Sequence, residues 1–212
     1  MENHNTTGTK VSGQNSIGIL GAGHIAQAVA RHAAKAGYEV TISSRRAPAE
    51  LTGLASSLGE RVKTGTLAEA AASDLVLIAV PFDQVQAAAR GIDWAGRIVI
   101  DTTNAIVFPQ FKPADLGGRT SSKVNAEFFP GASLIKAFNT LPAAILASDP
   151  ESDGGRRVIF VAGDEEVPKK QVINFAKKLG FSALDLGKID EGGRLQEFGG
   201  SLISKNLIRL DL

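Results

Sequence analysis

The chain has 212 residues, of which 43% are hydrophobic and 21% charged, and its formal net charge is +1. These values are typical of a globular protein with one large domain, and a charge this small provides no overall field that favours nucleic acid or a membrane surface as a partner. The absence of cysteine excludes disulfides, thiolate catalysis and cysteine-ligated metals, and it agrees with an expected cytoplasmic location.

The first residues are polar and contain no apolar run. We therefore expect residues 1–15 to be a disordered leader and not a signal peptide. Residues 16–212 are expected to form a single domain with a C-terminal extension. No apolar run approaches the roughly 18 residues of a membrane helix, so no membrane partner is expected.

Short apolar runs alternate with helical segments from residue 17 onward. The run LVLIAV at 75–80 is apolar throughout, which is typical of a strand buried on both faces. In chain order we expect strand 17–20, helix 25–36, strand 40–43, helix 49–58, strand 62–63, helix 67–72, strand 75–80, helix 83–90, strand 98–100, a loop over 105–120, strand 134–138, strand 158–162, helix 167–179 and strand 183–186.

This order favours an α/β fold, a doubly wound and mainly parallel Rossmann sheet with helices on both faces. The tail after the last strand is irregular and then apolar over residues 202–210. We expect this apolar tail to pack against a partner subunit, which predicts a homodimer.

A glycine-rich turn lies between the first expected strand and helix, where residues 21–26 read G-x-G-x-x-A. Gly21 permits the tight turn, Gly23 lets a pyrophosphate approach the backbone, and Ala26 lets the helix pack closely on the sheet. The helix N-terminus presents free N–H groups to the phosphates. The alternative is a tight turn without a ligand. The predicted cofactor contacts are Gly21, Ala22, Gly23, His24 and Ile25.

The end of the second strand carries Ser43, Ser44, Arg45 and Arg46. Proteins that bind NAD place an acidic residue about 20 residues past the glycines, where it binds the ribose. Guanidinium groups and hydroxyls would instead bind the 2′-phosphate of NADP(H). We therefore predict an NADP(H) site; the alternative is a solvated basic loop.

Several acid–base arrangements are excluded by the sequence. The Tyr-x-x-x-Lys pair of short-chain dehydrogenases is impossible, since the only tyrosine is Tyr38 and Ile42 follows four residues later. His4 lies in the leader, His32 is expected on the helix surface, and His24 is expected to be a neutral turn residue. No histidine cluster indicates a metal.

The remaining candidates are also interpreted as structural. Lys136 is expected to be a surface lysine at a strand end; the alternative is a catalytic base. The acidic run 164–166 is expected to be the solvent-exposed start of a helix. Asp101 is a further notable carboxylate. With no evident acid–base residue, an acceptor that takes a hydride directly makes the fewest demands, and a flavin-like ring is of that kind.

Five segments resemble the NADP oxidoreductase family that depends on the deazaflavin coenzyme F420. Of these, the K-A-F-N-T-L segment and the late G-D-x-E are the more specific. The segments are residues 19–23, 44–46, 79–82 and 136–143, and a last group at 162–165 that continues at 184–187 and 193–195.

The resemblance implies that the glycine turn holds the pyrophosphate and that the S-R-R corner holds the 2′-phosphate. It also implies that residues at further strand ends line the nicotinamide and the acceptor ring. The implied cofactor neighbours are Ala79, Val80, Pro81, Asn104, Ala137, Asn139 and Thr140, and the implied substrate neighbours are Leu141, Pro142 and Ala143.

The leading interpretation is an NADP(H)-dependent oxidoreductase that passes a hydride between NADPH and a deazaflavin (F420) or flavin as small-molecule acceptor. A second interpretation keeps NADPH and reduces a quinone, a ferric chelate or another small acceptor. A third is a non-catalytic sensor of the NADPH/NADP ratio, which would bind NADPH without turnover.

Overall fold

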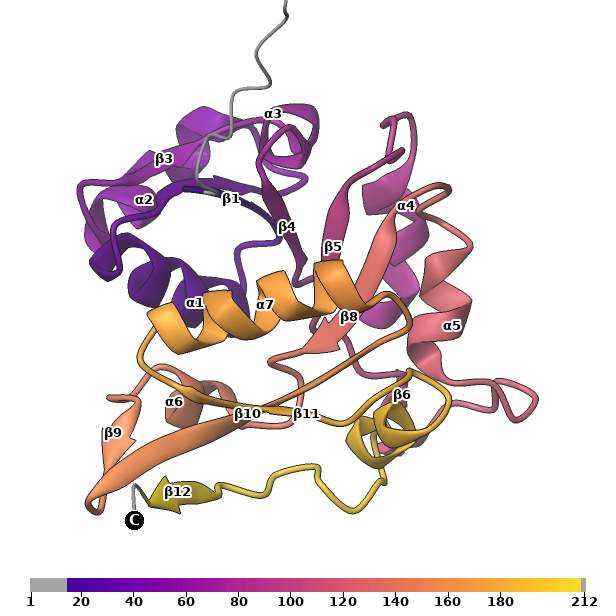
Figure 1. Cartoon of the computed structure of the whole chain (residues 1–212). Helices are drawn as coiled ribbons and strands as arrows, with labels where there is room; N and C mark the ends of the chain where they lie inside the picture. The colour runs from indigo at the N-terminus through magenta and orange to yellow at the C-terminus, as the bar shows by residue number, and fades with distance from the viewer. Residues whose placement is uncertain (1–14, 211–212) are drawn as a thin grey trace, which may run out of the picture.

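The computed structural model describes residues 15–210 (Figure 1). The expected leader, residues 1–15, lies outside the described part of the chain except for Asn15. At that point the chain is tied to the sheet, because the backbone N–H groups of Asn15 and Ser16 donate to the Asp74 carboxylate. Among the described residues, no helix has both the length and the apolar character needed to cross a membrane.

The principal sheet begins with a parallel half that the apolar runs predict correctly. Its strand order is β3-β2-β1-β4-β5-β8, and every neighbouring pair in this order is parallel. The carboxyl ends of these strands therefore meet at one edge of the sheet, which is where ligands bind in open α/β folds. The strands are β1 (Ser16–Leu20), β2 (Glu39–Ser43), β3 (Val62–Thr64), β4 (Leu75–Ile78), β5 (Ile98–Asp101) and β8 (Ser133–Ala137).

The direction of the sheet reverses beyond β8. The long strand β10 (Gly155–Gly163) is antiparallel to β8, and β11 (Ser182–Asp185) is parallel to β10. Two short strands, β9 (Glu151–Ser152) and β12 (Ile208–Leu210), pair antiparallel with the start of β10. The expectation of a mainly parallel Rossmann sheet is confirmed, and the antiparallel part is an addition to it.

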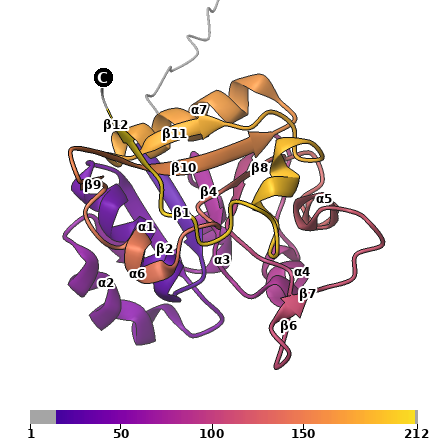
Figure 2. The ribbon, with the colours of Figure 1, turned by 90° about the horizontal axis from the view of Figure 1, so that it is seen from below.

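Helices cover both faces of the sheet, as expected (Figures 1 and 2). On one face lie α1 (His24–Lys35), α2 (Thr52–Leu58), α6 (Ala143–Leu146) and α7 (Glu166–Lys178). On the other face lie α3 (Leu67–Ala71), α4 (Val85–Ala89) and α5 (Ser121–Ala126). Short 3-10 helices span Pro48–Leu51, Phe82–Gln84 and Gly192–Gln196.

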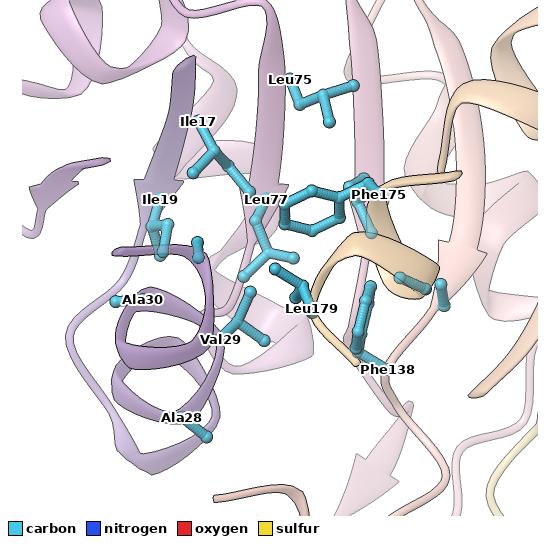
Figure 3. Packing of buried hydrophobic residues seen from close by; sticks show 14 of the residues in the cluster. Ile17, Ile19, Ala28, Val29, Ala30, Leu75, Leu77, Phe138, Phe175 and Leu179 are labelled. Carbon is cyan, nitrogen blue, oxygen red and sulfur yellow. The ribbon is translucent and has the colours of Figure 1, made fainter. Parts of the chain in front are cut away.

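Alternating side chains of the strands supply two separate cores. Ile17 and Ile19 of β1 face α1 and α7, whereas Leu20 faces α3 and α4. The first core is closed by aromatic rings, including Phe138 and Phe175, which meet edge to face at 6.0 Å (Figure 3). This two-sided burial is why the strands are apolar without a period of two.

The structure corrects two details of the sequence-based description. The expected loop at 105–120 contains a hairpin of β6 (Ile106–Val107) and β7 (Lys112–Pro113), whose two-residue strands are too short to show a pattern. His32 is buried and not on the surface; its Nε2–H donates to the Leu146 carbonyl at 2.8 Å, and burial lowers the pKa of its ring. In addition, the end of the apolar tail forms β12, which pairs with β10 of the same chain.

Candidate dinucleotide and acceptor site

The two glycines of the turn are required for different reasons. Gly21 has a φ of 130°, and a Cβ there would lie 2.1 Å from the carbonyl oxygen of Ala79, so the fold itself needs glycine. Gly23 is the N-cap of α1, has an extended backbone, and faces open space, because a Cβ added there would have no atom within 4 Å. The free space at Gly23 lies where the first N–H groups of α1 point outward, which suits a pyrophosphate.

The corner after β2 lies next to the glycine turn. A cavity of about 190 Å³ is lined by Gly23, Ser44 and Arg45 together with residues of the β4–α4 connection. Arg45 donates from Nη1 to Gln84 Oε1 at 3.1 Å, while the backbone N–H of Arg46 donates to Ser44 Oγ at 3.0 Å. Both guanidinium groups are exposed, so the corner presents two cations to a ligand.

Ser43 differs from its predicted role as a cofactor contact. Its side chain is fully buried, and its hydroxyl donates to the Ile19 carbonyl at 2.9 Å, while its own carbonyl accepts from the Gly21 N–H. Ser43 therefore holds the glycine turn against β2, and its buried hydroxyl group is not exposed to a ligand.

A wider cavity of about 510 Å³ opens at the carboxyl ends of β1, β4 and β5. It shares Gly23 and residues 79–81 with the cavity at the arginine corner, so the two form one surface on either side of the turn. This arrangement suits an extended dinucleotide with its pyrophosphate at the turn. The wider cavity is lined by Gly23, His24, Ile25, Ala79, Val80, Pro81, Phe82, Asp83, Thr102, Thr103, Asn104, Ile106 and Phe108.

Asn104 and Asn139 are paired through their side chains. Asn104 donates to the Asn139 carbonyl at 2.9 Å, and Asn139 donates to Asn104 Oδ1 at 3.0 Å and to the Gln196 carbonyl at 2.7 Å. Asn104 lines the wide cavity, whereas Asn139 is buried behind it. Ala137 and Thr140 are also buried, and none of these three predicted contacts lines the wide cavity.

Lys136 is the clearest difference from the sequence-based description. It is completely buried and not a surface residue; its Nζ donates to the Thr103 carbonyl at 3.0 Å and to Ser121 Oγ at 3.2 Å, and lies 3.5 Å from Asp101 Oδ2. Its strand pairs with β5, and register Asp101↔Lys136 places both side chains at the strand ends.

Asp101 is ionised by this environment. Burial alone would raise the pKa of its carboxyl group, but the Lys136 ammonium group and hydrogen bonds from Ser122 and Thr103 outweigh burial and lower it. The pair fixes the backbone of Thr103, which lines the wide cavity. Lys136 therefore supports the cavity wall from below.

None of the predicted substrate neighbours lines the wide cavity. Leu141 is buried, Pro142 is the exposed N-cap of α6, and Ala143 lines a groove of about 330 Å³ between α6 and α1. His24 lines both that groove and the wide cavity, so the two are neighbours. The structure thus brings Ala143 close to the glycine turn, while the segment before it is a supporting wall.

Several residues that line the two cavities escaped the sequence analysis, and three of them matter most for the site. Gln84 lies at the arginine corner, and Ile106 and Phe108 of the hairpin line the wide cavity. The available signal for the hairpin was the apolar run of residues 105–108 followed by Phe111, within a stretch rich in proline and glycine. Nothing in the sequence indicated Gln84, because its hydrogen bond with Arg45 depends on how close the connection after β2 lies to the connection after β4.

The parallel half-sheet and the glycine turn at its carboxyl edge define a Rossmann-type dinucleotide-binding protein. Residues 16–105 match the model of the family described as NADP oxidoreductase coenzyme F420-dependent, which confirms the resemblance to this family over the N-terminal part of the chain. The matched segment includes the glycine turn, the arginine corner and Asn104.

Solved structures and curated proteins resemble the chain over most of its length. A hypothetical protein from Sinorhizobium meliloti is 41% identical, with a TM-score of 0.88 over 92% of this chain and 96% of that one. A structure from Arthrobacter sp. FB24, described as an F420-dependent NADP-reductase, is 28% identical with a TM-score of 0.68, over 84% and 86% of the two chains.

The metalloreductase STEAP3 of Rattus norvegicus is 31% identical over 176 residues, which cover 82% of this chain and 34% of that protein. The chain therefore spans about a third of the length of the curated relatives that it matches.

Proposed function

We propose that the protein is an NADPH-dependent oxidoreductase that transfers a hydride from the nicotinamide to a flavin-type ring, either a deazaflavin such as coenzyme F420 or a flavin. In this step the C4–H bond of the nicotinamide breaks, its electron pair moves with the hydrogen to the acceptor ring, and NADP⁺ remains. A proton from water completes the reduced flavin.

The observation that carries the proposal is the shared wall of the two cavities. Gly23 and residues 79–81 line both, so a dinucleotide with its pyrophosphate at the turn would extend from the arginine corner into the wide cavity. Its adenosine phosphate would meet Arg45 and Arg46, and its nicotinamide would reach the ends of β4 and β5. The remaining volume beside Asn104 is available to an acceptor.

The protein's own residues then bind the cofactor, orient its nicotinamide ring and exclude water from it. Asn104, held by its paired amide, offers a fixed polar contact for the nicotinamide carboxamide. His24 and Asp83 are the titratable side chains among the residues that line the wide cavity, and both are exposed. Proton exchange with solvent therefore needs no buried relay, which suits an acceptor that takes the hydride directly.

A second candidate is reduction of a ferric chelate, and the metalloreductase relatives support it. A quinone, or a sensor that binds NADPH without turnover, is a further alternative from the sequence. Initial rates of NADPH oxidation with FMN, FAD, a 5-deazaflavin, quinones and ferric citrate discriminate among them. No turnover with any of these acceptors would contradict the oxidoreductase proposal and favour the sensor.

The choice of cofactor provides the first prediction. Arg45→Ala combined with Arg46→Ala should weaken NADPH binding about ten-fold or more and leave NADH binding nearly unchanged, because only NADPH carries the 2′-phosphate. The effect should shrink as salt is added. Dissociation constants measured by fluorescence titration at low salt provide the check, and Arg90→Ala is a control for loss of one exposed cation. Equal losses for both cofactors, or a wild-type preference for NADH, would contradict the assignment.

We further propose that the protein acts in the cytoplasm as a homodimer. The cysteine-free sequence supports the location. The exposed apolar side chains of the tail, Leu207 and Leu210, support the dimer, because β12 leaves both about half exposed after pairing with β10.

A further inference from the structure

The wide cavity has one aromatic wall. Phe108 lines this cavity and is nevertheless 64% exposed, and Phe111 beside it is 63% exposed. The two rings meet edge to face, with centroids 5.0 Å apart. Two adjacent exposed aromatic rings at a ligand cavity indicate a surface that a ligand covers.

The hairpin that carries Phe108 is anchored on several sides. Its strands pair at Ile106↔Pro113 and at Val107↔Lys112, and the Ala114 N–H donates to the Ala105 carbonyl at 2.9 Å just below them. Phe111 in turn contacts Phe198 of the C-terminal segment, with ring centroids 6.1 Å apart. Figure 2 shows the hairpin projecting from the body of the molecule.

Phe108 shares its cavity with residues at the ends of β4 and β5. The same cavity is walled by Pro81 from the β4–α4 connection and by Asn104 from the end of β5, where the nicotinamide is proposed to lie. Phe108 is thus a second, apolar wall of the space left for the acceptor. An aromatic ring supplies a flat face of large area, which favours a planar conjugated ligand over a compact, hydrated metal chelate.

We propose that Phe108 is the stacking platform for the acceptor ring and makes the site selective for planar, flavin-sized acceptors. The inference rests on the proposed function for the place of the nicotinamide. The acceptor ring lies between the nicotinamide and Phe108, and Phe111 contacts the Phe108 ring in a T-shaped arrangement. Phe108 then sets which acceptor binds, while the cofactor is held elsewhere.

Direct binding tests this platform separately from turnover. FMN and a 5-deazaflavin are titrated by fluorescence against the full chain saturated with NADP⁺. Phe108→Ala should weaken binding of both rings about ten-fold, since stacking on one aromatic side chain is of that size. Phe108→Trp should bind within about two-fold of wild type, and Phe108→Leu, which keeps apolar bulk without the flat face, should resemble the alanine variant.

Two controls separate stacking from other causes. NADPH affinity should be unchanged in every Phe108 variant, and Val167→Ala, at an exposed apolar position on α7, should leave ring binding unchanged. Absence of ring binding in the wild type, or a Phe108→Leu variant that binds as the wild type does, would overturn the inference. The inference would also be overturned if Phe108→Ala bound both rings as the wild type does and differed from it only in the mass measured by light scattering.

The failure of the proposed function has a different signature. A wild type that binds FMN and loses this binding in Phe108→Ala, but oxidises no NADPH, would refute hydride transfer and support the platform. Rates with ferric citrate that fall as much as ring binding in Phe108→Ala would instead overturn the proposed selectivity.

Discussion

At the scale of single residues, the two glycines of the turn separate folding from binding. Gly23 has an extended backbone and open space at its Cβ position, whereas Gly21 combines a φ of 130° with a carbonyl oxygen 2.1 Å from that position. Valine at Gly23 would therefore fill the proposed place of the pyrophosphate with little disturbance of the fold, whereas valine at Gly21 would meet the backbone of Ala79, just after β4.

This contrast gives a matched pair of variants. Gly23→Val should abolish NADPH and NADH binding together, while its unfolding free energy falls by at most about 1 kcal/mol, the effect of a poorer N-cap. Gly21→Val should lose more than about 2 kcal/mol through strain and overpacking, and its melting temperature should fall by at least about 4 °C. Calorimetry of each variant with and without NADPH measures both the stability and the cofactor binding. A folded Gly23→Val protein with wild-type affinity would remove the basis for the dinucleotide site.

The buried pair of Lys136 and Asp101 predicts how stability depends on pH. The folded state lowers the pKa of Asp101, so its contribution to stability is present above the ordinary aspartate pKa and is lost as the pH falls through the lowered value. Without Lys136, burial would instead raise the pKa of Asp101, and protonation would relieve the unpaired charge.

Lys136→Met should therefore reduce the unfolding free energy by about 3–5 kcal/mol at neutral pH, with a smaller penalty near about pH 4. Asp101→Asn combined with Lys136→Met removes both charges and should recover much of the loss. Urea unfolding at several pH values makes the measurement. A penalty that is independent of pH would show that Lys136 contributes packing alone.

At the scale of elements, patterns in the sequence predict the strands that are buried on both faces of the sheet and miss most of the very short strands. Strands β1, β4 and β5 are largely apolar runs beside amphipathic or alanine-rich helices, so their type and order follow from periodicity. Strands β6, β7, β9 and β12 are two or three residues long and are defined by their partners. Their existence depends on tertiary contacts that no local window contains.

The same distinction applies to the candidate site. The glycine turn was predictable because the geometry of a strand, a tight turn and a helix demands particular residues at fixed spacing. Lys136 was not, because its burial depends on carboxylate and hydroxyl partners from β5 and α5, which are distant in sequence. The reversal at β10 was also hidden, since an antiparallel strand and a parallel one of this kind have similar apolar runs.

At the scale of the whole molecule, the proposed dimer can be tested through the tail. Light scattering at micromolar concentration should give the mass of two chains. Leu207→Ser combined with Leu210→Ser should shift the mass to one chain, because these side chains remain exposed after β12 has paired. Val167→Ser, an equally apolar loss on α7, is the control. A wild-type mass of one chain would contradict the dimer.

The arginine corner has a consequence for the history of the protein. Arg45 and Arg46 are exposed on a connection after β2, and the side-chain partner of Arg45 is Gln84, itself on another connection. Substitutions there leave the buried cores untouched, so selection can exchange one nicotinamide cofactor for the other without passing through an unfolded intermediate. Descendants of one ancestral chain can therefore diverge in which cellular pool of reducing power they use while they inherit the same scaffold.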